Sequence, residues 1–178
     1  MAEHPARVQF SIEGHDGVEV GTAVAALRWD EAPRTCAAIV AQLPIETTCF
    51  HGKNSGAEAL LVTPTCVKDL PQDASESATQ AHALGNVLFG FEPSGFCVGG
   101  AGYDDCSEIA WIYGPAAQAT FWVSEDGPPH DKPPYRRQAA TLNHFAQIVE
   151  ERGFYAASRD LIKSGELRVR VTATAHCS

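Results

Sequence analysis

The sequence predicts a mainly β protein, a closed β-barrel of about eight strands with two helices, formed by one domain over residues 1–178. Two observations predict this fold class. Several segments alternate apolar and polar residues, which is typical of strands with one buried face. Only two segments have helical spacing, which is too few for a sheet covered by helices on both sides. Eight strands can instead close into a barrel that is filled by their inward side chains.

A β-hairpin is predicted near the N-terminus. Residues 7–12 alternate apolar and polar side chains, and residues 14–17 carry the glycines and the aspartate of a turn. Residues 18–29 then form a longer alternating strand. Two strands joined by a short turn are expected to pair as antiparallel neighbours.

A helix is predicted directly after this hairpin. Pro33 suits its first turn, and Asp30 or Glu31 supplies the negative charge that a helix start favours. Pro44 is expected to end it. The residues that form its apolar face recur at helical spacing and are Cys36, Ile39, Val40 and Leu43.

The middle of the chain carries further strand patterns, separated by polar or proline-rich loops. The predicted strands are residues 47–51, 58–63, 86–91, 96–98, 107–113 and 119–123. Residues 64–84 are predicted to be a loop or a short irregular helix, and residues 124–138 a second long loop. Because strands resume after each loop, neither loop is interpreted as a linker between domains.

The C-terminal part predicts one ambiguous element, one helix and one strand. Residues 143–150 fit a strand or a helix by pattern alone. Residues 153–164 predict a helix that ends at Gly165. Leu167, Val169 and Val171 alternate with polar residues and predict the final strand.

Composition and charge argue against several classes of partner. The formal net charge is −9 and the basic residues are scattered, which argues against binding to nucleic acids and to anionic membranes. No run approaches the roughly 18 apolar residues of a membrane span. Residues 1–5 lack the basic and apolar regions of a signal peptide, which predicts a cytoplasmic protein. Its six cysteines are then expected to be reduced thiols.

Three stretches resemble the cyclophilin superfamily. Residues 27–36 contain a strand followed by Ala32-Pro33-Arg34-Thr35 and a helix. Phe50-His51 with Gly56 is similar to the Phe-His-Arg strand of that group. Residues 143–150, followed by a helix and a final strand, are similar to its C-terminal end. The resemblance implies a cyclophilin-like barrel and favours a strand at residues 143–150.

A closer resemblance is to an uncharacterised bacterial family with this fold, the domain of unknown function 3830. The matching motifs are Leu43-Pro44, residues 51–56 (HGKNSG) and residues 108–114 (EIAWIYG). Their order and spacing, together with the start of the first helix, carry this resemblance. It implies a fold but no established activity.

Prolyl isomerase chemistry is not expected. The barrier to rotation about a peptide bond is about 18–20 kcal/mol, set by amide resonance. In cyclophilins an arginine that donates to the prolyl nitrogen lowers this barrier. The resemblance places Gly52, which has no side chain, at the position of that arginine. Lys53 is the alternative cation, but it lacks the planar fork of arginine and neighbours in a strand point to opposite faces. A weak prolyl isomerase and an amide-hydrolysing enzyme remain alternative functions.

The candidate ligand-binding residues lie around the segment 50–58. Strand alternation places Cys49 and His51 on one face and Phe50 on the other. The predicted site is a polar pocket at one mouth of the barrel, which holds a small carboxylate or amide. The alternative is a loop whose polar side chains only cap its own turns. The predicted ligand-binding residues are His51, Lys53, Ser55, Glu58, Glu108 and Tyr113.

Other arrangements give alternative hypotheses. Cys49 with His51 would form a thiol–base pair, and the helix start near Cys36 would lower the pKa of that thiol. Ser55 and His51 with Asp104 or Asp105 would form a hydrolytic triad, although the sequence has no Gly-x-Ser-x-Gly motif. No paired motif of metal ligands occurs, so neither a metal nor a cofactor is predicted. A structural or assembly role, with a homo-oligomer, is the third class of function.

Overall fold

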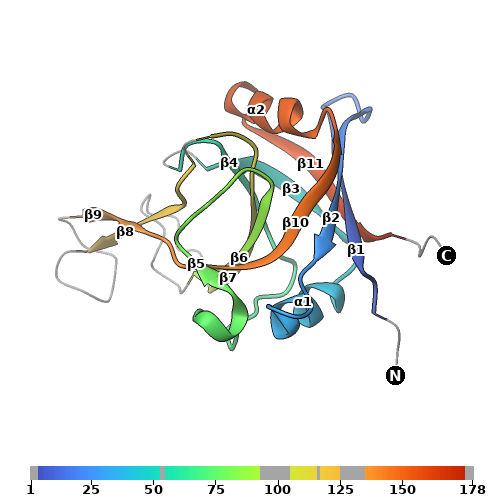
Figure 1. Cartoon of the computed structure of the whole chain (residues 1–178). Helices are drawn as coiled ribbons and strands as arrows, with labels where there is room; N and C mark the ends of the chain where they lie inside the picture. The colour runs from blue at the N-terminus through green and yellow to red at the C-terminus, as the bar shows by residue number, and fades with distance from the viewer. Residues whose placement is uncertain (1–3, 53–54, 93–104, 116, 125–134, 175–178) are drawn as a thin grey trace.

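The computed structural model describes residues 4–52, 55–92, 105–115, 117–124 and 135–174 (Figure 1). The barrel strands are β1 (Arg7–Glu13), β2 (Glu19–Leu27), β3 (Ile45–His51), β4 (Glu58–Val62), β6 (Asn86–Glu92), β7 (Cys106–Ile112), β10 (Leu142–Arg152) and β11 (Glu166–Ala173). The helices are α1 (Pro33–Val40) and α2 (Phe154–Ser164), with a short 3₁₀ helix, η1 (Ala74–Glu76). Outside the barrel lie β5 (Ala78–Thr79), β8 (Thr120–Ser124) and β9 (Tyr135–Ala139).

The eight barrel strands close into an antiparallel barrel, as the sequence predicts. Their order is β2-β1-β11-β3-β4-β7-β6-β10, and a pairing between β10 and β2 closes the ring. Residues 143–150 lie in β10, so the choice of a strand there is confirmed. The predicted strand at residues 96–98 lies outside the described residues.

The predicted loop at residues 124–138 is wrong in its C-terminal part. Residues 135–139 form β9, which pairs with β8 as a two-stranded sheet of its own. This β8–β9 arm projects from the side of the barrel (Figure 1). Prolines and charged residues dominate the composition of this segment, so its residue pattern is typical of a loop. The strand depends instead on pairing with β8, about fifteen residues upstream. Residues 64–84 contain η1 and the short β5, which agrees with the predicted irregular helix.

Alternating side chains of the barrel strands fill its interior. On β1, Val8, Phe10 and Ile12 are buried, which matches the predicted alternation. An aromatic cluster lies beneath α2, where the ring of Phe154 is 5.4 Å from that of Trp111 and 5.9 Å from that of Phe10. The Trp111 indole donates to the Ser158 hydroxyl at 2.8 Å and so ties the helix to the barrel. This packing holds α2 over one end of the barrel (Figure 1).

Helix α1 closes the opposite end, and the carboxylate at its start comes from an unexpected residue. Its first turn contains no acidic residue, and Asp30 and Glu31 come before its N-cap, Ala32. The Glu76 carboxylate instead accepts from the amides of Arg34 and Thr35, at 3.2 and 3.0 Å. The sequence pattern did not indicate this contact because it depends on tertiary structure, in which η1 places the buried Glu76 against the start of α1. The helix also ends at Val40, before Pro44.

A second, smaller core lies on the outer face of the barrel. It consists of Leu88, Ala110, Ala119, Ile112, Ala140 and Leu142. Since Ala110 and Ile112 alternate with the inward Ile109 and Trp111, β7 is buried on both faces. The segments that flank the β8–β9 arm cover this face. No helix in the described parts of the chain combines the length and apolar character that crossing a membrane requires.

Candidate functional site

His51 lies at the last position of β3, at the mouth of the barrel that α2 covers. Cys49 is fully buried whereas Phe50 is 36% exposed, so the alternation turns Cys49 and His51 inward. The imidazole packs edge-on against the Tyr113 ring, with centroids 6.0 Å apart and an interplanar angle of 80°. Its Nδ1 is buried and has no hydrogen-bond partner among the described residues. A buried polar atom without a hydrogen-bond partner costs free energy. This nitrogen therefore favours a ligand that supplies the missing hydrogen bond.

Tyr113 follows β7 and lies near two charged groups. Burial raises the pKa of its phenol, and the nearby Glu58 carboxylate raises this pKa further, while Arg159 of α2 lowers it. The phenol is therefore protonated at neutral pH and is able to donate a hydrogen bond.

Glu58 begins β4 and lies directly against Gly52. Its side chain is only 2% exposed, and it stands opposite Ile112 on the outer face of the barrel. A Cβ added at Gly52 would lie 2.7 Å from Oε2 of Glu58. The absence of a side chain at Gly52 thus makes room for a carboxylate against the backbone.

Ser55 connects the 52–58 turn to the segment before β8. Its amide donates to the Gly52 carbonyl at 3.0 Å, and its carbonyl accepts from the amide of Gln118 at 2.9 Å. Its hydroxyl accepts from the amide of Thr120 at 3.3 Å. These contacts favour the interpretation of Ser55 as a residue that stabilises its own loop.

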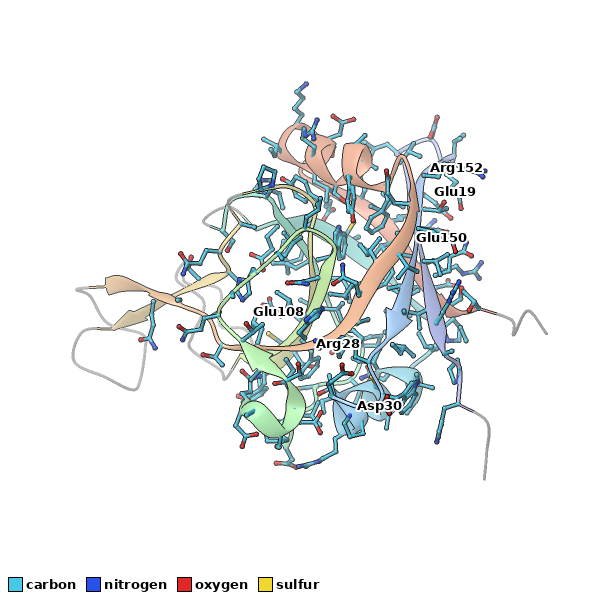
Figure 2. All side chains as sticks on the ribbon, viewed as in Figure 1. Glu19, Arg28, Asp30, Glu108, Glu150 and Arg152 are labelled. Carbon is cyan, nitrogen blue, oxygen red and sulfur yellow. The ribbon has the colours of Figure 1, made fainter. Side chains whose placement is uncertain are left out.

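The structure brings only part of the predicted set together. His51 and Tyr113 pack together and form what we call the mouth cluster, whereas Glu58 and Ser55 lie beside it. Lys53 lies outside the described residues. Glu108 is four residues from Ile112 on β7, about 13 Å along the strand. It is 7% exposed, packs near Gly90, and lies well away from α2 (Figure 2).

A groove of about 810 Å³ lies next to His51, between β3 and the C-terminal end of α2. We call it the mouth groove. Its lining residues are Thr48, Phe50, His51, Leu161, Ile162, Ser164, Gly165 and Glu166. Five of these eight come from α2, the turn that follows it and the first residue of β11, and none of the five was among the predicted site residues. One signal in the sequence could have indicated these residues. Ile162 is an apolar residue on the polar side of α2, and it is 62% exposed.

Comparison with known proteins identifies the family. Residues 16–124 match the model of a family described as protein of unknown function, DUF3830. The chain belongs to this DUF3830 family. A solved structure with 21% sequence identity is the solution structure of the hypothetical protein AF2241 from Archaeoglobus fulgidus, with a TM-score of 0.49. The alignment covers 98% of this chain and 100% of that one. No curated protein matches the sequence.

The family model matches only some of the residues around the mouth groove. The residues matched to DUF3830 include the mouth cluster and Glu108, whereas α2 and β11 follow the matched region. One wall of the mouth groove therefore comes from the family motifs, and the other comes from the C-terminal part of the chain.

The cysteine hypotheses are not supported in this DUF3830 protein. Burial raises the pKa of Cys36 and of Cys49 to about 12 in each case. The expectation that the start of α1 lowers the pKa of Cys36 is thus wrong, because desolvation of the thiolate outweighs the effect of the helix. Cys36, Cys49, Cys66 and Cys106 are free thiols, as predicted, and Cys97 and Cys177 lie outside the described residues.

The hydrolytic triad also fails to assemble. Asp105 forms an ion pair with Lys68 at the start of β7, whereas His51 lies near the other end of that strand. Asp104 lies outside the described residues. Across the part of the chain that is described, no three His, Cys, Asp or Glu side chains are grouped as a metal site.

A polar network that the sequence analysis missed lies toward the α1 end of the barrel. Arg28 donates to the Ser77 hydroxyl at 3.1 Å, to the His144 carbonyl at 3.0 Å, and contacts His144 Nδ1 at 2.5 Å. Figure 2 labels Arg28 beside the ribbon of β10. Its partners are Ser77, which follows η1, and His144 of β10. The network therefore joins segments that are far apart in the sequence, and we interpret its role as structural.

Proposed function

We propose that this DUF3830 protein binds a small polar ligand in the mouth groove, next to the 50–58 segment, and that it has no prolyl isomerase activity. The observation that carries the proposal is the His51 imidazole, which lines the groove while its buried Nδ1 has no partner among the described residues. Tyr113 packs against this ring and adds a protonated phenol near the groove. A concave surface with apolar walls and few polar groups is typical of ligand sites.

Two features of Gly52 support the proposed absence of isomerase activity. The position at which the cyclophilin resemblance expects an arginine has no side chain. The space where that side chain would begin is occupied by the Glu58 carboxylate, 2.7 Å from an ideal Cβ. This carboxyl group leaves no room for a cationic side chain at that position. A coupled proline-peptide assay is therefore expected to give the background rate.

The binding proposal is tested with a library of small carboxylates and primary amides, screened by the shift they cause in Tm. We expect at least one compound to raise the Tm, and His51→Ala to weaken its binding about tenfold, the loss of one buried hydrogen bond. His15→Ala is the matched control, because His15 lies in the exposed turn between β1 and β2.

Circular dichroism of both variants verifies that the barrel is folded. Equal binding by His51→Ala and the wild-type protein would contradict the proposed site, even if a ligand is found. A turnover of proline peptides above background would contradict the second half of the proposal.

A further inference from the structure

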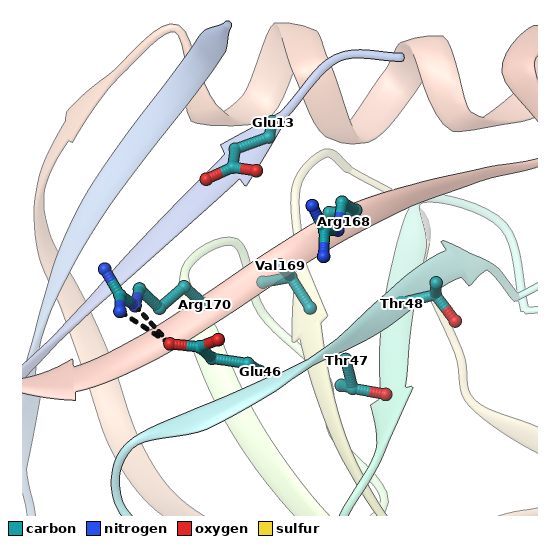
Figure 3. Close-up of a pocket in the computed structure, with 7 residues that line it drawn as sticks. All are labelled: Glu13, Glu46, Thr47, Thr48, Arg168, Val169 and Arg170. Carbon is teal, nitrogen blue, oxygen red and sulfur yellow. Dashed lines mark hydrogen bonds and ion pairs between the residues drawn. The ribbon is translucent and has the colours of Figure 1, made fainter. Parts of the chain in front are cut away.

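A second groove continues the mouth groove along the outer face of the barrel. It has a volume of about 520 Å³ and is lined by Glu13, Glu46, Thr47, Thr48, Arg168, Val169 and Arg170 (Figure 3). Thr48 lines both grooves. The two grooves therefore adjoin at Thr48, and we refer to them together as the trough, which lies over β3 and β11 between α2 and β1.

The trough contains two arginines, and only one of them is neutralised by a neighbour. Arg170 donates to Oε1 of Glu46 from Nε at 2.8 Å and from Nη2 at 2.6 Å (Figure 3). Arg168 lies two residues earlier on the same outward face of β11. Among the described residues, no carboxylate lies within ion-pair distance of Arg168. Arg168 is thus the cation that is available to an anion in the trough.

The register of β3 and β11 places an apolar surface at a defined distance from Arg168. Phe50 stands opposite Glu166, and Thr48 stands opposite Arg168. The step from Phe50 to Thr48 is two residues, or about 7 Å along the strand. Phe50 is 36% exposed and Ile162 of α2 is 62% exposed, and both line the mouth groove. Along its length the trough therefore presents apolar side chains, a threonine hydroxyl and a guanidinium.

We infer that the ligand of this site is an amphipathic carboxylate, with an aryl or alkyl group on Phe50 and Ile162 and its carboxylate on Arg168. This inference rests on the proposed function and names its ligand class. A guanidinium offers a planar pair of donors that matches the two oxygens of a carboxylate. Apolar burial at Phe50 supplies the rest of the affinity.

The carboxylates around Arg168 define how the ligand lies. Glu166 faces the apolar end of the trough, and Glu13 stands opposite Arg168 on β1. Both repel an anion, so the ligand carboxylate approaches Arg168 from the side of Thr48, its partner on β3. Removal of the Glu166 charge should consequently strengthen binding of a carboxylate and weaken binding of an amine.

The test is a titration of the full chain with 4-phenylbutyrate and, separately, with 3-phenylpropylamine, which carries an ammonium in place of the carboxylate. Binding is followed by the backbone amide signals in nitrogen-15 NMR. We expect 4-phenylbutyrate to shift the signals of residues 48–51 and 161–168, and the amine to shift none of them.

Three variants assign the effect to single charges. Arg168→Gln is expected to weaken 4-phenylbutyrate binding about tenfold, the loss of a charge-assisted hydrogen-bond pair. Glu166→Gln is expected to strengthen it about twofold, because an exposed charge acts weakly. Arg7→Gln is the control, because Arg7 also belongs to an exposed ion pair, with Glu150, but lines neither groove, and it should leave binding unchanged.

Each other outcome overturns the inference. Preferential binding of the amine, an equal loss in Arg168→Gln and Arg7→Gln, or the absence of shifts at residues 48–51 would each contradict it. If the inference alone is wrong, a library compound still binds in a manner that depends on His51. If the proposed function is wrong as well, no compound depends on His51.

Discussion

His144 shows how a single side chain is set by its neighbours. Burial, and after it the positive charge of Arg28, lower the pKa of its imidazole from 6.5 to about 4. A guanidinium only donates hydrogen bonds, so the contact from Arg28 to Nδ1 requires that nitrogen to be unprotonated. Asn86 lies at the other ring nitrogen, 3.1 Å away. The folded protein therefore holds this histidine in its neutral form.

The low pKa of His144 predicts a stability that depends on pH. Above pH 6.5 the imidazole is neutral in both the folded and the unfolded chain, and it contributes no dependence. Between pH 6.5 and about 4 the unfolded chain binds a proton that the folded chain does not, so the free energy of unfolding falls as the pH falls. We expect His144→Gln to remove this part of the slope in urea denaturation measured at several pH values.

The control for this prediction is His15→Gln, which should retain the wild-type slope because His15 lies in an exposed turn. Identical slopes in the wild-type protein and His144→Gln would show that the folded protein does not hold this imidazole neutral.

At the scale of elements, α1 depends on a carboxylate from another segment. Its N-cap, Ala32, has no side chain that could accept from the first amides of the helix. Glu76 replaces that cap with two amide contacts and a third from the Thr35 hydroxyl at 2.8 Å. The helix dipole further favours a negative charge at this end. Thus α1 and η1 stabilise each other.

We expect Glu76→Gln to lower the free energy of unfolding by about 2 kcal/mol, since it removes charge-assisted bonds and places an amide donor against amide donors. Asp30→Asn is the matched control, because it removes the carboxylate that the sequence places near the helix start but that caps nothing. Denaturation in urea measures both. Equal stability of the two variants would contradict the role of Glu76.

At the scale of the whole molecule, the barrel leaves one sheet outside its ring. Within the described residues, β8 and β9 pair only with each other. A two-stranded ribbon is marginally stable alone, and its outer edges present unpaired backbone groups that are suited to another chain. This favours the homo-oligomer that the sequence analysis kept among its alternatives.

We expect light scattering to show a homodimer, and hydrogen exchange of the amides at residues 120–124 and 135–139 to slow as the protein concentration rises. The amides of β1 and β11, inside the barrel, serve as the internal control and should not change. A strictly monomeric protein with exchange independent of concentration would contradict this expectation.

The sequence alone determined most of the barrel and part of the site. Period-two alternation in β1 and β11 predicted their buried faces, and the same alternation turned His51 inward and Phe50 outward. Such patterns are local, because neighbouring residues in a strand point to opposite faces whatever the strand pairs with. The first-helix motif and the residues around His51 also predicted the family that the comparison confirmed.

Only the tertiary structure decided what those residues meet. The pairing of β10 with β2 closes the barrel, and the end of α2 supplies Ile162 to the groove beside His51. Glu76 reaches α1, and Glu108 lies apart from the site although it shares a motif with Tyr113. Each of these arrangements depends on segments that are distant along the chain. Local periodicity carries no information about which distant segment packs there, whereas closure of the barrel and its strand register do.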